Sequence, residues 1–187
     1  MRSQRVRTRA RKPNLLTILM CAIVASCGTD SPVGPPPPES LAELFGEQLL
    51  RANGTSVGIE EVEDKTLIAI YFAAQGCPAC GQFTPLLVDA YHEIRQADRS
   101  FEVVLVSSDG SQEHMLAHMT DSSMPWLAVA WGSTEASGLG QRYGVRWIPT
   151  VIVVDGAGKT VSVDGRDEIA ALGAGAYDQW LARSGGG

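Results

Sequence analysis

The fold is decided by the stretch TLIAIYFAAQGCPAC, which runs from Thr66 to Cys80. Its first eight residues are an unbroken run of apolar, β-branched and aromatic side chains, which is typical of a short strand buried on both faces. After a turn, CPAC opens a segment with apolar residues at helical spacing, namely Phe83, Leu86, Leu87, Ala90, Tyr91 and Ile94. The stretch therefore places two cysteines where a buried strand is followed by a helix.

The position of Cys77 and Cys80 at the start of a helix has a chemical consequence. The first turn of a helix presents unpaired N–H groups and the positive end of the helix dipole, which would stabilise a thiolate at Cys77. The pKa of this thiol would then fall below the free value of about 8.5. Cys80 lies one turn along the helix, and Pro78 suits the first helical position because its missing N–H costs no hydrogen bond. The pair can therefore cycle between a dithiol and a disulfide.

Several spaced motifs resemble the thioredoxin superfamily. The order strand, CPxC, helix is followed by Pro85, five residues past the second cysteine. The tryparedoxin and nucleoredoxin group is closer still, at YFAA (71–74), CPAC (77–80), FTP (83–85), MPWLAV (124–129) and VRWIPT (145–150). The resemblance covers about residues 40–183. It implies an α/β fold, a thioredoxin-like three-layer sandwich with a central mixed β-sheet flanked by helices.

The resemblance also implies roles for single residues, with Cys77, Cys80 and Pro149 as the catalytic set. Cys77 would attack a substrate disulfide as the thiolate, and the more buried Cys80 would then release the reduced substrate. Pro149 would be a cis-proline that removes a backbone donor near the sulfurs and leaves the backbone of Ile148 free to pair with a substrate. The substrate-binding residues would be Gly76, Pro78, Ala79, Trp126, Trp147 and Ile148.

The aromatic residues leave alternatives open. Trp147 could be a wall of the substrate groove or part of the core, and Trp126 could be the rim of the groove or part of the core. The side chains of Tyr71, Phe72 and Phe83 are expected in the core.

Three positions depart from the pattern of related families. Most of those families have tryptophan where this chain has Gly76, so its substrate preference is open. Thioredoxin itself has a buried aspartate at the position of Tyr71, so water or another group must take the proton of Cys80. Cys80 is followed directly by Gly81 and Gln82 and not by a basic residue, so thiolate stabilisation is expected to rest on the helix terminus.

A CxxC sequence also occurs in zinc sites and in inert structural disulfides. His114 and His118 are four residues apart on a predicted helix, but the gap from Cys80 to His114 is far longer than in a compact zinc finger. The thioredoxin-like layout would also place that helix across the sheet from the cysteines, with both histidines at the surface. We therefore expect no metal, and no cofactor apart from the redox-active Cys77–Cys80 disulfide.

The N-terminus differs from the rest of the chain. Six of the 15 basic residues lie within residues 2–12, and residues 1–26 contain no acid. The apolar run 15–25 is too short for a membrane span of roughly 20 residues but suits the core of a signal peptide. It ends in VASC, which resembles a bacterial lipobox with Cys27 as the lipidated residue; the alternative is a plain signal peptide with a chance cysteine. Lipid on Cys27 would tether the chain to a membrane without crossing it.

Charge and cysteine usage agree with export. Removal of residues 1–26 leaves 9 basic and 21 acidic residues, a formal charge of −12. Such a charge argues against nucleic-acid partners. Cys21 would leave with the signal peptide and Cys27 would carry lipid, so only Cys77 and Cys80 would remain as thiols.

Beyond the central stretch, strands are expected to alternate with helices, which implies parallel pairing. The expected helices are 40–50, 78–96, 111–121, 133–143, 167–172 and 176–182, the last packing Tyr177, Trp180 and Leu181 on the sheet. The expected strands are 57–62, 101–106, a short one within 124–131, and a hairpin of 149–154 with 160–163.

Together these patterns predict a signal peptide (1–26), a proline-rich linker (27–39), a thioredoxin-like domain (40–184) and a disordered tail (185–187). The predicted function is that of a thiol–disulfide oxidoreductase, exported and lipid-anchored, that faces the periplasm or the cell exterior. We expect a monomer that reduces protein disulfides with electrons from a membrane donor. A disulfide oxidase or isomerase is one alternative, and a non-catalytic thioredoxin-fold binding module is another.

Overall fold

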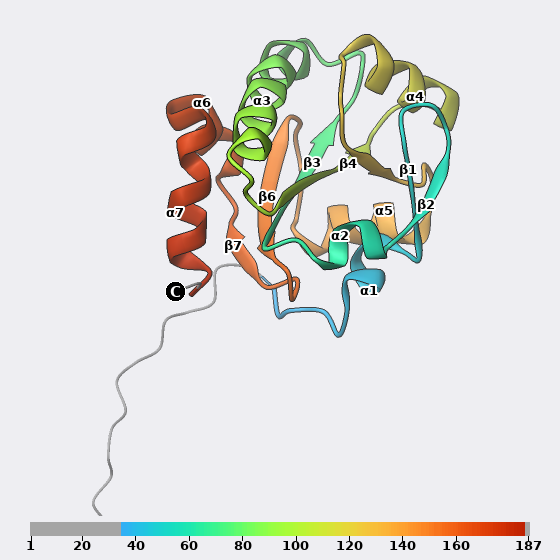
Figure 1. Cartoon of the computed structure of the whole chain (residues 1–187). Helices are drawn as coiled ribbons and strands as arrows, with labels where there is room; N and C mark the ends of the chain where they lie inside the picture. The colour runs from blue at the N-terminus through green and yellow to red at the C-terminus, as the bar shows by residue number, and fades with distance from the viewer. Residues whose placement is uncertain (1–34, 186–187) are drawn as a thin grey trace, which may run out of the picture. The chain divides into compact units, whose positions relative to one another are not determined.

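The computed structural model describes residues 35–185 (Figure 1). The predicted signal peptide, the lipidation site Cys27, most of the linker and the last two residues of the tail lie outside this range. Pro35–Glu39, the described end of the linker, forms neither helix nor strand. A guanidinium N–H of Arg142 donates a hydrogen bond to the carbonyl of Pro36. Within residues 35–185, no helix combines the length and the apolar character needed to span a membrane.

The described residues form a mixed sheet of seven strands in the order β2-β1-β5-β4-β3-β6-β7. Parallel pairing joins β3 to β4 and β4 to β5, whereas β6 runs antiparallel to β3 and to β7. The strands are β1 (Gln48–Leu50), β2 (Ser56–Gly58), β3 (Leu67–Ala73), β4 (Phe101–Ser107), β5 (Leu127–Val129), β6 (Thr150–Asp155) and β7 (Thr160–Ser162).

Helices cover both faces of the sheet and complete the predicted three-layer arrangement (Figure 1). One face packs against α3 (Pro78–Gln96), α4 (Gln112–Asp121), α6 (Gly165–Leu172) and α7 (Ala176–Arg183). The other packs against α1 (Leu41–Phe45), α2 (Glu60–Glu63) and α5 (Thr134–Arg142). The fold class expected from the sequence is confirmed.

The central strand β3 divides its side chains between the two cores. Leu67, Ala69, Tyr71 and Ala73 lie in the core under α3, and the intervening residues Ile68, Ile70 and Phe72 lie in the core on the opposite face. All seven residues are buried. The unbroken apolar run is explained by this arrangement, because successive side chains of a strand point to opposite faces and both faces are covered.

A partly buried carboxylate ties the last helices to the sheet. Glu168 of α6 accepts hydrogen bonds from Trp180 Nε1 at 2.6 Å, Ser162 Oγ at 2.7 Å and Arg183 Nη1 at 2.5 Å. Burial raises the pKa of Glu168, but these hydrogen bonds lower it by more, so the pKa lies below the usual value. The carboxylate thereby connects α6, α7 and β7.

Two expectations about elements are wrong. The helix predicted over 40–50 ends at Phe45, and Leu49 and Leu50 belong to β1, which pairs with β2 and β5. The strand predicted over 57–62 is shorter, because Glu60–Glu63 forms α2.

The position of α4 is a third correction. This helix was expected across the sheet from the cysteines, yet its Met115 and Met119 pack in the same core as Leu87 of α3. The helix with the two histidines therefore lies on the face of the sheet that carries the cysteines.

Candidate active site

Cys77 is the N-cap of α3, at the end of the turn that follows β3. Its Sγ accepts a hydrogen bond from the backbone N–H of Cys80 at 3.1 Å, which is the helix-terminus contact expected to stabilise a thiolate. Pro78 occupies the first turn, and α3 has the bounds that the sequence predicts. The local sequence therefore places this sulfur against the N–H of Cys80 in the first turn of the helix.

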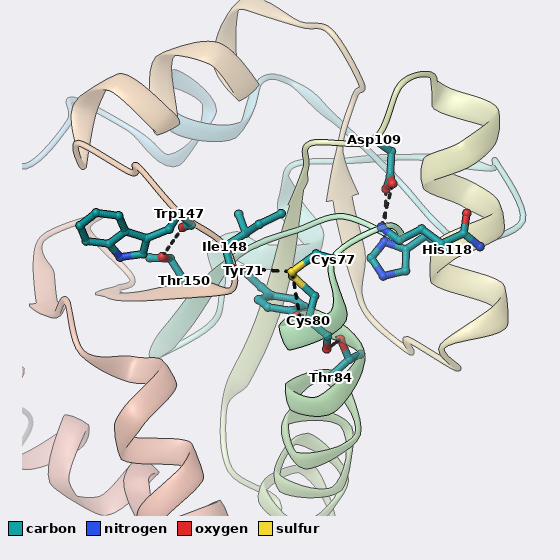
Figure 2. Close-up of a disulfide and its surroundings, with 10 residues drawn as sticks. Tyr71, Cys77, Cys80, Thr84, Asp109, His118, Trp147, Ile148 and Thr150 are labelled. Atoms are coloured by element: carbon teal, nitrogen blue, oxygen red, sulfur yellow. Dashed lines mark hydrogen bonds and ion pairs between the residues drawn. A yellow bond between two sulfur atoms is a disulfide. The ribbon is translucent and has the colours of Figure 1, made fainter.

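Cys77 and Cys80 form a disulfide across one turn of α3 (Figure 2). Cys77 is partly exposed, whereas Cys80 is 0% exposed and belongs to the core that contains Leu87. Only the sulfur of Cys77 can therefore be approached from solvent.

The loop before β6 faces the disulfide. The Ile148–Pro149 peptide bond is cis, as expected, and the carbonyl oxygen of Ile148 lies 3.7 Å from Cys77 Sγ. Trp147 precedes this pair and is 74% exposed, so its side chain is not in the core. Its carbonyl accepts a hydrogen bond from Thr150 Oγ1 at 2.8 Å, which holds the loop against the start of β6 (Figure 2).

A buried chain of hydroxyl groups runs beneath the cysteines. Thr84 Oγ1 donates to the carbonyl of Cys80 at 2.8 Å, so the hydroxyl of Tyr71, also 2.8 Å away, donates to Thr84 Oγ1. Burial raises the pKa of Tyr71 to about 12. The Tyr71 hydroxyl thus stays protonated near neutral pH and is not a base for the Cys80 thiol.

The turn before Cys77 is held from the side of α4. The backbone N–H of Gln75 donates to Asp109 Oδ1 at 2.8 Å, and Asp109 Oδ2 lies 3.2 Å from Nδ1 of His118. The side chains of Asp109 and His118 are 5% and 4% exposed. The expectation that His118 lies at the surface is therefore wrong, whereas His114 is exposed.

The other predicted substrate-binding residues divide into two groups. Gly76, Pro78 and Ala79 are exposed around Cys77, and a Cβ placed on Gly76 would meet no atom within 4 Å. Trp126 is only 1% exposed and packs edge-on against the rings of Tyr71 and Tyr91. Its prediction as a rim of the groove is wrong, because the side chain fills the core under α3.

A pocket of about 550 Å³ opens next to the cis-proline loop. Val145 and Arg146, just before Trp147, form one side, and Ser107 and Ser108 at the end of β4 form another. Within residues 35–185, no group of three or more His, Cys, Asp or Glu side chains is placed to bind a metal ion.

Sequence reasoning missed Thr84 and Asp109 and misplaced His118. Thr84 comes four residues after Cys80, a spacing that puts both on one face of a helix. Asp109 follows a buried parallel strand, where polar residues often gather at the sheet edge. His118 comes three residues after the buried Met115, so helical spacing could have indicated an inward position.

Comparison with known proteins agrees with this geometry. The model of a family described as thioredoxin-like matches residues 64–160, more than half of the chain. Nucleoredoxin of Xenopus laevis is 38% identical over 144 residues, which cover 76% of this chain and 33% of the relative. Nucleoredoxin of Mus musculus is 37% identical over 143 residues, covering 76% and 32%. The chain thus spans about a third of the length of these curated relatives.

Solved structures extend the comparison over nearly whole chains. Tryparedoxin from Trypanosoma brucei has a TM-score of 0.66 at 30% identity and covers 75% of this chain and 96% of its own. Thioredoxin from Wuchereria bancrofti has a TM-score of 0.63 at 34% identity and covers 74% and 96%.

A disulfide at the start of α3 and a cis-proline loop that faces it agree with the matching family model, and the chain belongs to the thioredoxin-like family. Within the family it is similar to the nucleoredoxins and tryparedoxins, as the motifs predict. The relatives named above are eukaryotic, so a bacterial lipoprotein stays a prediction.

Proposed function

We propose that this chain catalyses thiol–disulfide exchange on protein substrates through Cys77 and Cys80. The observation that carries the proposal is the asymmetry of the pair. The sulfur of Cys77 is reachable and accepts an N–H at the start of α3, whereas Cys80 is fully buried behind it. Such a pair suits an attacking thiolate and a resolving thiol.

The reaction follows from this asymmetry. The Cys77 thiolate attacks one sulfur of the substrate disulfide, forms a mixed disulfide and expels the other substrate sulfur as a thiolate. The thiol of Cys80 loses its proton and attacks Cys77 Sγ, so the second substrate sulfur leaves and the Cys77–Cys80 disulfide forms. Two electrons have then passed from the protein to the substrate. A dithiol donor returns them by the reverse exchange.

The surface around Cys77 suits a polypeptide substrate. The carbonyl oxygen of Ile148, 3.7 Å from Cys77 Sγ, can accept a hydrogen bond from a substrate backbone N–H. Trp147 offers an exposed aromatic face, and the pocket beside Arg146 has room for a substrate side chain. The open space at Gly76 leaves the approach to Cys77 wide.

We further propose that the chain works outside the cytoplasm as a lipid-anchored reductase. Support comes from the apolar run 15–25, the VASC sequence that ends at Cys27 and the proline-rich segment after it. A reductase in that compartment needs a membrane electron donor. Radiolabelled palmitate incorporation and membrane fractionation test the anchor; a Cys27→Ser variant that keeps both label and membrane association would contradict it.

Trapping of the mixed disulfide tests the exchange itself. In a Cys80→Ser variant, the attack by Cys77 proceeds and its resolution does not, so a covalent adduct with a disulfide-containing test protein such as insulin is expected on a non-reducing gel. A Cys77→Ser variant is the matched control and gives no adduct, since Cys80 is buried. Equal cellular function of Cys77→Ser and wild type would instead favour a non-catalytic binding module.

A further inference from the structure

A buried pair of ionisable side chains, Asp109 and His118, lies beside the turn that leads into Cys77 (Figure 2). Asp109 follows β4 and His118 belongs to α4, and their facing atoms are 3.2 Å apart. The exchange steps described above use neither residue.

The Asp109 carboxylate bonds to the backbone of the turn that presents Cys77. Its Oδ1 accepts the N–H of Gln75 at 2.8 Å, and Gln75 is two residues before Cys77. The N–H of Cys77 donates to the carbonyl of Ala74 at 3.2 Å, so Gln75 lies inside the same turn. The carboxylate therefore fixes the backbone that aims the reactive sulfur.

Other contacts hold Asp109 itself in place. Its Oδ2 accepts a hydrogen bond from Ser107 Oγ at 2.8 Å, and its carbonyl accepts one from Trp131 Nε1 at 2.6 Å. The side chain of Gln75 donates to Asp121 Oδ2 at 3.0 Å, which ties the turn to the end of α4. The turn is thus joined to β4 and α4 as well as to α3.

The burial of Asp109 explains why a histidine stands opposite it. A buried carboxylate is costly unless it is hydrogen-bonded. Nδ1 of His118, 3.2 Å from Asp109 Oδ2, lies where an N–H can donate to this carboxylate, while Oδ1 keeps its bond to Gln75.

We propose that Asp109 and His118 are positioning residues for the redox dithiol: Asp109 holds the turn from Ala74 to Cys77, and His118 holds the Asp109 carboxylate in the orientation that bonds to Gln75. This inference rests on the proposed thiol–disulfide exchange, because it assigns the pair a role in presenting the attacking sulfur.

The rate at which the reduced full chain reacts with insulin, measured where Cys77 is fully ionised, tests the support from His118. His118→Ala removes the side chain that faces Asp109 and is expected to lower this rate several-fold. His118→Asn keeps an N–H donor near Asp109 and should recover most of the wild-type rate. His114→Ala, at the exposed histidine of the same helix, is the matched control and should leave the rate unchanged.

Comparison of two variants at Asp109 tests the turn separately and does not depend on the folding of His118→Ala. Asp109→Asn keeps an acceptor for the Gln75 N–H, whereas Asp109→Ala loses it. Asp109→Ala is therefore expected to lower the rate at which the fully ionised Cys77 thiolate reacts with insulin about tenfold.

Either of two results would overturn the inference. One is a His118→Ala variant that reacts with insulin as fast as the wild type, or a His118→Asn variant that is as slow as His118→Ala. The other is an Asp109→Ala variant that reacts as fast as Asp109→Asn. Because Cys77 still reacts with insulin in each case, these results leave the exchange reaction standing. A wild-type Cys77 that does not react with insulin would overturn both proposals.

Discussion

Removal of the buried hydroxyl groups of Tyr71 and Thr84 is expected to show strong energetic coupling between them. Tyr71→Phe deletes one hydrogen bond, while Thr84 Oγ1 still donates to the carbonyl of Cys80. The expected loss in the free energy of unfolding is about 1 kcal/mol. Thr84→Val leaves the Tyr71 hydroxyl buried without its acceptor, which costs about 2 kcal/mol.

The double variant separates coupling from simple addition. With both hydroxyl groups gone, no buried donor lacks an acceptor, so the expected total loss is about 1 kcal/mol rather than about 3 kcal/mol. Urea unfolding of the four oxidised proteins at pH 7 measures all three differences. A double variant that loses the sum of the single losses would refute the hydroxyl chain described beneath the cysteines.

The same Tyr71→Phe variant tests whether this residue moves a proton. Because burial raises the pKa of Tyr71 to about 12, its removal should leave the pH profile of insulin reduction between pH 6 and 9 unchanged. Tyr177→Phe, which changes a buried tyrosine of α7, is the control for nonspecific effects. A profile that loses a titration step only in Tyr71→Phe would contradict this assignment.

Three further predictions concern the substrate surface and the last helices. Trp147→Ala should raise KM for insulin several-fold with little change in kcat, since the ring is 74% exposed and is proposed to contact substrate; steady-state kinetics check this, and an unchanged KM would contradict it. Gly76→Trp should fold with wild-type stability, because the space there is open, and should change the ratio of kcat/KM between two protein disulfides; an unchanged ratio would count against Gly76 as a substrate contact. Glu168→Gln should lose about 2 kcal/mol at pH 7. Since the pKa of Glu168 is lowered in the folded state, this difference is fully present above the usual value of 4.5 and is lost as pH falls through the folded pKa, so urea unfolding at pH 7 and at lower pH should show it shrink.

The parts of the fold set by local sequence could be predicted well. The bounds of α3 follow from a cap at Cys77, a proline at the first helical position and a continuous apolar stripe. The apolar run of β3 indicates burial on both faces, and both faces are covered. These signals depend on neighbours in the chain and need no knowledge of the tertiary partners.

Elements that depend on distant partners were predicted less well. Leu49 and Leu50 continue an apolar spacing that suits a helix, but pairing with Val129 and Ala128 makes them a strand. The aromatic side chain of Trp126 suits a groove or a core equally, and only the position of α3 above β3 decides for the core.

The candidate site also combines residues that local sequence indicates with residues that only tertiary packing brings together. Cys77, Cys80 and Pro149 could be found because their motifs carry chemistry within a few residues. The contact between Asp109 and Gln75 joins residues 34 positions apart, and the pair of Asp109 with His118 needs α4 on the face of α3. Such contacts arise from the packing of the sheet and have no local signature.

The reduction potential of the Cys77–Cys80 pair in the purified chain tests the central claim most directly, by equilibration against glutathione buffers. The proposed reductase predicts a reversible two-electron couple near thioredoxin's value of about −270 mV. A couple near about −120 mV would reverse the proposed direction of electron transfer and mark an oxidant. A pair that does not titrate as a dithiol and disulfide would contradict catalysis by exchange altogether.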